Sequence, residues 1–97
     1  MYTLILNETS FQINSFGRNT YFQEDGSYTS NGYMNFVNSN NLAATLHALA
    51  QEPITSFIIK MNNEVVYDAG EINARIQSID ENLSGDTMSV NLNIQFH

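Results

Sequence analysis

The chain has 97 residues, 42% of them hydrophobic, and its formal net charge is −7 because it holds only three lysine and arginine residues. This length suits a single domain over residues 1–97, and the hydrophobic content is too high for intrinsic disorder. Arg18, Lys60 and Arg75 cannot supply the basic cluster that binds nucleic acid or an anionic membrane, so we expect neither partner. The lack of cysteine excludes disulfides and thiolate metal sites.

The first third of the sequence is typical of β-strands. Apolar residues recur at every second position in residues 2–6, and extended structure continues through residues 11–16. The sequence Gly17-Arg18-Asn19 interrupts this pattern, so we expect a break there. The strand pattern resumes over residues 20–22.

A hairpin turn is predicted at Asp25-Gly26, because this pair suits the positive φ angles of tight turns. Residues 28–37 follow as a strand, with Tyr33 and Met34 on opposite faces. Within that strand, Asn31-Gly32 predicts a second turn or a bulge.

One amphipathic helix is predicted over residues 42–50, which are rich in good helix formers. Its apolar stripe, spaced by three and four residues, comprises Leu42, Leu46 and Leu49. Side chains at residues 39–41 can cap the first turn by accepting a hydrogen bond from a free backbone N–H. Pro53 ends the helix, because the residue before a proline avoids the helical conformation.

The second half of the sequence gives a clearer strand pattern. Residues 54–61 and 64–67 are β-branched and aromatic, and Asn62-Asn63 between them is a hairpin signal. Residues 72–79 alternate until the period slips by one residue, which predicts a bulge near Gln77-Ser78.

The strongest strand signal lies at the end of the chain, after a predicted turn at Ser84-Gly85-Asp86. Apolar and polar residues alternate without exception over residues 88–96, as in a strand with one buried face and one solvated face. The helix stripe is expected to pack on the apolar side. The polar side is neutral, and we expect it to mark a sheet edge where Asn91, Asn93 and Gln95 pair with another chain. Alternatively, these side chains form an ordinary solvated face.

These elements predict an α+β domain in which one amphipathic helix packs on one face of an antiparallel sheet. The sheet should have about six or seven strands, in the order β-β-β-α-β-β-β-β. Alternating strands joined by hairpin turns favour antiparallel pairing over parallel βαβ units.

Aromatic residues are concentrated in the first third of the sequence. Surfaces that are rich in tyrosine and poor in lysine are typical of protein contacts. We therefore interpret Tyr21, Tyr28 and Tyr33 as candidate contact residues. The alternative is that they share an aromatic core with the neighbouring phenylalanines.

The sequence contains no recognisable catalytic machinery. Nucleophilic catalysis needs an oriented base, and the bases of suitable pKa are His47, roughly opposite the leucine stripe, and the last residue, His97. We expect both histidines to lie at the surface. Two distant histidines cannot form a zinc site. The carboxylates lie mainly in turns, as solvated residues or, alternatively, as calcium ligands. We predict a protein that is not an enzyme and that carries no metal or other cofactor.

Four stretches lie within residues 42–96, a span that makes up more than half of the chain: LAATLHALAQEPITSFII (Leu42–Ile59), EVVYD (Glu64–Asp68), INARIQSIDENL (Ile72–Leu83) and MSVNLNIQF (Met88–Phe96). The composition and residue pattern of these stretches resemble those of small proteins encoded among the structural genes of tailed bacteriophages and prophages. The resemblance implies a part in a capsid, tail or baseplate. It carries no residue with an assigned chemical role, so it implies no site.

The predicted function is that of a virion or assembly component that binds other protein chains and forms a homo-oligomer. The alternative is a small acidic anti-defence inhibitor that binds a host nuclease or sequesters a signalling nucleotide. A DNA mimic would need carboxylates on one face, which their position in turns disfavours. Because residues 1–6 lack a secretory signal pattern, we expect synthesis in the host bacterial cytoplasm, followed by incorporation into the virion.

Overall fold

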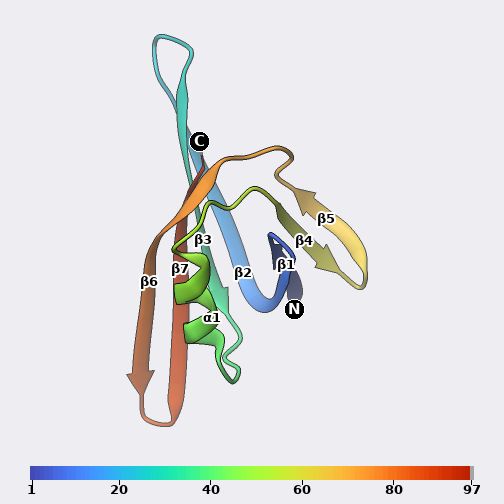
Figure 1. Cartoon of the computed structure of the whole chain (residues 1–97), viewed down its shortest axis with the longest axis vertical. Coiled ribbons are helices and arrows are strands. Elements are labelled where there is room, and N and C mark those ends of the chain that lie inside the picture. The colour runs from blue at the N-terminus through green and yellow to red at the C-terminus, as the bar shows by residue number, and fades with distance from the viewer. Residues whose placement is uncertain (97) are drawn as a thin grey trace.

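The computed structural model describes residues 1–96 (Figure 1). They form β1 (Tyr2–Leu6), β2 (Thr9–Phe22), β3 (Tyr28–Phe36), α1 (Leu42–Leu49), β4 (Phe57–Met61), β5 (Glu64–Asp68), β6 (Ala74–Ser84) and β7 (Thr87–Phe96). The predicted α+β class, the single helix and the order of the elements are confirmed. The predicted surface position of His97 lies outside the described residues.

The strands form one antiparallel sheet in the order β5-β4-β1-β2-β3-β7-β6. Along its whole length β7 is hydrogen-bonded to β6, and it also pairs with β3. The prediction that Asn91, Asn93 and Gln95 lie at a sheet edge is therefore wrong. Their strand fills the vacant side of β3 instead of ending the sheet, and the edges are β5 and β6.

β2 is long because it belongs to two halves of the sheet. Residues 9–13 pair with β1, and Ile13 and residues 15–22 pair with β3, whose register shifts at Asn14. An extra residue in one strand bends that strand and increases its twist. Figure 1 shows the result, with β1, β4 and β5 on one side of β2 and β3, β7 and β6 on the other.

The two halves curl around one core. Phe57 of β4 and Phe96 of β7 are four strand positions apart in the sheet, which would separate them by about 19 Å if the sheet were flat. Their ring centroids nevertheless lie 5.4 Å apart. The ring of Phe16 contacts Phe57 at 5.2 Å and Tyr67 at 5.1 Å. Aromatic contacts across the core thus stabilise the curvature of the sheet.

Arg18 links the same two halves. Its Nε donates a hydrogen bond to the hydroxyl of the fully buried Ser30, and its Nη1 donates to the hydroxyl of Tyr67 at 2.8 Å. The guanidinium lies 4.0 Å from the ring centroid of Phe96, a cation–π geometry. One of the three cations of the chain is therefore used inside the fold.

α1 covers the core on one face of the sheet. Leu42, Leu46 and Leu49 are buried in the same cluster as the apolar residues of β7, so the predicted stripe and its packing partner are confirmed. The predicted side-chain cap is wrong. Asn41 occupies the cap position in a left-handed conformation, with φ 66°, and its side chain makes no capping hydrogen bond. Side-chain capping requires an extended backbone at this position.

Most of the predicted turns and bulges are confirmed. Asn62 and Asn63 have positive φ angles of 53° and 65° in the β4–β5 turn, and Gly26 has φ 89° in the β2–β3 turn. The register of β6 shifts between Ile76 and Ser78, where the bulge was predicted.

Two predictions based on glycine are wrong. β2 runs without a break through Gly17, and β3 runs without a turn through Gly32. A Cβ added at Gly32 would lie 2.9 Å from the ring of Phe96, and one added at Gly17 would collide with the ring of Tyr33. Each glycine therefore leaves space for an aromatic ring from the neighbouring strand, which lies over it.

We predict that Leu92→Ala lowers the free energy of unfolding by about 2–5 kcal/mol, because Leu92 is 2% exposed and its loss leaves a cavity under α1. Urea denaturation measures the change. Thr87→Ala, an exposed position in the same strand, should change stability by less than about 0.5 kcal/mol. Equal effects of the two variants would contradict the placement of the core.

We predict a pH effect at the tip of the β2–β3 hairpin. The hydroxyl of Ser27, and then its backbone N–H, donate to the carboxylate of Asp25 and hold its pKa below the ordinary value. The resulting stabilisation is present above the unfolded-state pKa and is lost as pH falls through the folded-state pKa. Ser27→Ala should raise the pKa of Asp25 in an NMR titration, whereas Ser27→Thr should keep it low. An unchanged pKa in Ser27→Ala would refute this assignment.

Candidate functional site

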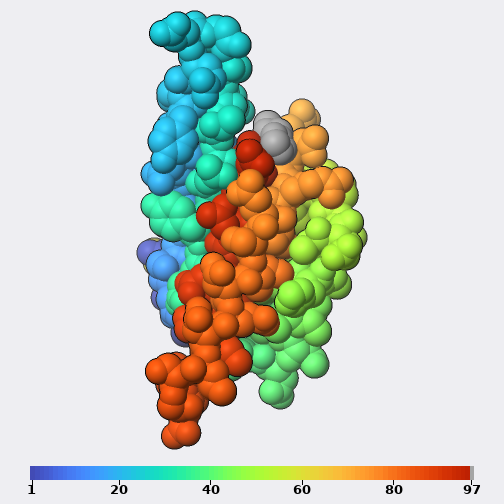
Figure 2. All heavy atoms as spheres, turned by 90° about the vertical axis from the view of Figure 1, so that its left-hand side faces the viewer, coloured from blue at the N-terminus to red at the C-terminus, as the bar shows by residue number. Residues whose placement is uncertain are grey.

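The face of the sheet opposite α1 carries mostly neutral polar side chains, and no other helix or strand of residues 1–96 covers it. We call the part formed by β2, β3, β7 and β6 the open face. It comprises Ser15, Gly17, Asn19, Tyr21, Thr29, Asn31, Tyr33, Asn35, Ser89, Asn91, Asn93, Gln95, Arg75, Ser78, Asp80 and Asn82. In Figure 2, β6 is turned toward the viewer and separates α1 and β4 (green) from β2 and β3 (blue to cyan).

Cross-strand pairing arranges the open face in rows. The central row is Gly17, Tyr33, Asn93 and Ser78; the rows on either side of it are Ser15, Asn35, Asn91, Asp80 and Asn19, Asn31, Gln95, Arg75. Rows lie about 6.8 Å apart along the strands, because every second residue points to the same face. The central row thus has one row of four residues on each side, at the same distance.

Tyr33 is the aromatic residue at the centre of the open face. It lies directly over Gly17, so that a Cβ on this glycine would collide with the tyrosine ring and hydroxyl. The side chain of Tyr33 is still 48% exposed. The glycine therefore seats a large ring flat on the sheet with one side available to another molecule.

Hydrogen bonds between amide side chains fix much of the surrounding surface. Asn14 Nδ2 donates to Asn35 Oδ1 at 2.8 Å, and Asn35 Nδ2 donates to Asn91 Oδ1 at 3.0 Å. Gln77 Nε2 donates to Gln95 Oε1 at 3.1 Å. Side chains that are already held in one rotamer lose less entropy when another molecule binds.

Two amide oxygens of the open face lack a donor. Asn31 Oδ1 and Asn93 Oδ1 are covered and accept no hydrogen bond from residues 1–96. A covered polar atom without a partner costs free energy, and a donor from outside could reach these oxygens only if the amide side chains rotated. Asn93 also borders a shallow hollow of about 180 Å³ beside Tyr33 and Asp80.

The charged groups of the open face lie along β6. Asp80 belongs to the row on one side of Tyr33 and Arg75 to the row on the other, and both are exposed. They are too far apart to pair with each other, because their partners Asn91 and Gln95 are four residues apart on β7. Within residues 1–96, the one close contact between a basic and an acidic side chain joins His47 Nε2 and Glu81 Oε2 at 3.6 Å, on the face that carries α1.

The structure brings together five of the six predicted contact residues. Tyr21, Tyr33, Asn91, Asn93 and Gln95 all belong to the open face. Tyr28 does not, because it pairs with Phe22 on the opposite face of the β2–β3 hairpin, at a ring-centroid distance of 6.3 Å. The three tyrosines therefore do not form one surface.

The β2–β3 and β6–β7 hairpins project from opposite ends of the molecule (Figure 2). With both hairpins included, the molecule measures 48 × 28 × 21 Å along its principal axes. Each hairpin exposes an apolar cross-strand pair on the face that carries α1. Phe22 is 78% exposed beside Tyr28 at one end, and Leu83 is 70% exposed beside Met88 at the other. These pairs extend the apolar face past the part that α1 covers.

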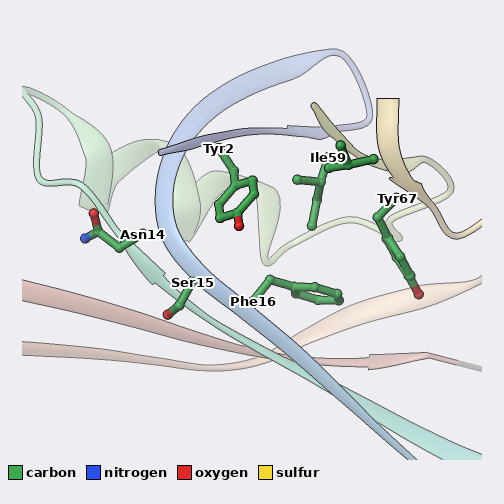
Figure 3. A pocket seen from close by; sticks show the side chains of 7 residues that line it. Tyr2, Asn14, Ser15, Phe16, Ile59 and Tyr67 are labelled. Carbon is green, nitrogen blue, oxygen red and sulfur yellow. The ribbon is translucent and has the colours of Figure 1, made fainter. Parts of the chain in front are cut away.

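A separate hollow of about 350 Å³ lies between β2 and the half of the sheet formed by β1, β4 and β5 (Figure 3). It is lined by Tyr2, Asn14, Ser15, Phe16, Ile59, Val66 and Tyr67. Its lining is mainly aromatic and aliphatic, without an acid–base pair. Sequence analysis missed this hollow, because its walls come from β1, β2, β4 and β5, which the curl of the sheet brings together.

Residues 1–96 place no three histidine, aspartate or glutamate side chains together as a metal site would require. His47 is solvent-facing, as predicted. No helix in the same range of residues is long and apolar enough to cross a membrane.

Comparison of the chain with protein-family models, with curated proteins and with solved structures gives no match.

We predict that Gly17→Ala destabilises the protein by roughly 1–3 kcal/mol, because the new methyl group displaces the ring of Tyr33. In an ordinary strand interior the same change is stabilising by roughly 0.5–1 kcal/mol. The penalty should disappear in a Tyr33→Ala background, which urea denaturation of the four proteins in the cycle would measure. A penalty of the same size in both backgrounds would contradict the contact.

Proposed function

We propose that this protein is a non-enzymatic assembly component that acts by binding other protein chains through the open face. The resemblance to small structural-region proteins of tailed bacteriophages and prophages makes a virion, a tail or a related assembly intermediate the proposed setting. In that setting the protein is made in the bacterial cytoplasm and is then built into the particle.

One observation carries the proposal: the open face combines a central, rigidly seated Tyr33 with asparagine, serine and glycine and almost no charge. Protein-binding surfaces are enriched in tyrosine and depleted of lysine and glutamate at their centre. Tyrosine supplies contact area at low entropic cost, while asparagine and serine supply adaptable hydrogen bonds.

The alternative of an acidic inhibitor that mimics DNA has less support. The ten carboxylates are dispersed over the chain, and three of them lie at opposite ends of the molecule, Glu24 and Asp25 in the β2–β3 turn and Asp86 in the β6–β7 turn. Mimicry requires an aligned row of charges on one face. The open face holds one carboxylate, that of Asp80.

The test follows the protein into particles. We expect the wild-type chain to co-sediment with particles released by cells that make it, and to be identified in them by mass spectrometry. Asn93→Lys should reduce incorporation several-fold, because it places an unpaired charge at the centre of the interface. Asn38→Lys, the same change at an exposed position of the β3–α1 loop, should have no effect.

Two results would contradict the proposal. The first is a wild-type chain that stays in the slowly sedimenting fraction under all conditions. The second is normal incorporation of an Asn93→Lys variant that is shown to be folded.

A further inference from the structure

We propose that the partner at the open face is a second copy of this chain, stacked face to face about a two-fold axis along the central row. This inference rests on the proposed function, because it names the partner of the same surface. Three features of the open face support the inference: the placement of its charges, the symmetry of its rows and its area.

The rows define where the axis must lie. An axis in the plane of the interface, perpendicular to the strands and through the central row, places Tyr33 opposite Tyr33 of the other copy. It likewise sets Asn93 and Ser78 opposite their own counterparts. Each β6 then lies over the β6 of the other copy with the strands antiparallel. Such an isologous contact buries the same patch on both copies.

The same axis also gives Asp80 and Arg75 of the open face partners of opposite charge. Asp80 lies one row to one side of the axis and Arg75 one row to the other, on the same strand. The rotation therefore brings each Asp80 opposite Arg75 of the other copy, which makes two intermolecular ion pairs. All other facing positions in these rows are neutral. A stack with the strands parallel would bring β6 over β2, and the two charges would meet only neutral side chains.

The lengths of the side chains suit this arrangement. Facing sheets pack about 10 Å apart with their strands offset by about 30°. An extended arginine and a short aspartate together span such a gap, and the flexible arginine accommodates the offset. Tyr33, seated flat on Gly17, stands low enough to face its counterpart without forcing the sheets apart.

The area allows a weak but specific dimer. Four strands about 4.8 Å apart and five rows about 6.8 Å apart give a flat area on the order of 500 Å² per copy, and more in accessible surface. Specific interfaces bury about 800 Å² on each partner. We therefore expect a dissociation constant on the order of micromolar or weaker.

The test is a charge swap, measured on pure protein by sedimentation equilibrium at low salt. The wild type should dimerise. Arg75→Asp alone places two carboxylates opposite each other, and Asp80→Arg alone places two guanidinium groups opposite each other. Each should weaken the dimer by about tenfold or more. The double variant restores opposite charges across the axis and should bring the affinity back to within a few-fold of the wild type.

Lys60→Asp is the matched control, because it changes the net charge as Arg75→Asp does but lies outside the open face. It should leave the dimer unchanged. Raising the salt concentration should weaken the wild type and the double variant alike.

Three outcomes would overturn the inference: a wild type that stays monomeric at all concentrations, single variants that dimerise normally, or a double variant that stays as weak as the singles. A monomeric wild type that still enters particles would refute the second copy and leave the proposed function standing, with another protein as the partner. A dimer of the expected kind that never enters particles would refute the proposed function alone.

Discussion

The position of β7 between β3 and β6 determines the character of both faces of the sheet. Val90, Leu92, Ile94 and Phe96 point toward α1 and are at most 2% exposed. The residues between them point the other way and supply the amide centre of the open face. A register shift of one residue would exchange these two sets, burying four polar side chains and exposing four large apolar ones. Hydrogen bonds on both sides of β7 fix this register.

The core needs only one face of this sheet because the sheet curls. Phe57 packs against Phe96 from the other half, and Arg18 joins Ser30 and Tyr67 from different strands. A single helix of eight residues then suffices to cover the remaining part of the core. No further layer of residues 1–96 lies over the opposite face, which is left to solvent or to another molecule. The architecture thus separates a face that is buried on folding from a polar face that we propose as the contact surface.

Sequence periodicity was sufficient for the elements but not for their arrangement. The alternation of β7 and the leucine stripe of α1 are local signals that report burial directly, so both were predicted correctly. The partner of a strand is decided by contacts far away in sequence, so the alternation of β7 does not indicate whether it lies at an edge or between two strands. Gly17 predicts a break from local sequence alone, because the ring that it accommodates belongs to Tyr33 on another strand. Composition and alternation are enough to propose five residues that share the open face, whereas their rows and the opposed charges on β6 require the pairing register.

Cross-linking tests most directly whether the open face forms a symmetric contact between two copies. The chain has no cysteine, so one thiol can be placed at will. Ser78→Cys puts it on the axis, opposite its own counterpart, while Asn82→Cys puts it on the same strand and the same face but two rows away. With a short bifunctional maleimide, the account predicts a covalent dimer for Ser78→Cys and almost none for Asn82→Cys. Equal cross-linking of the two variants, or none for either, would contradict it.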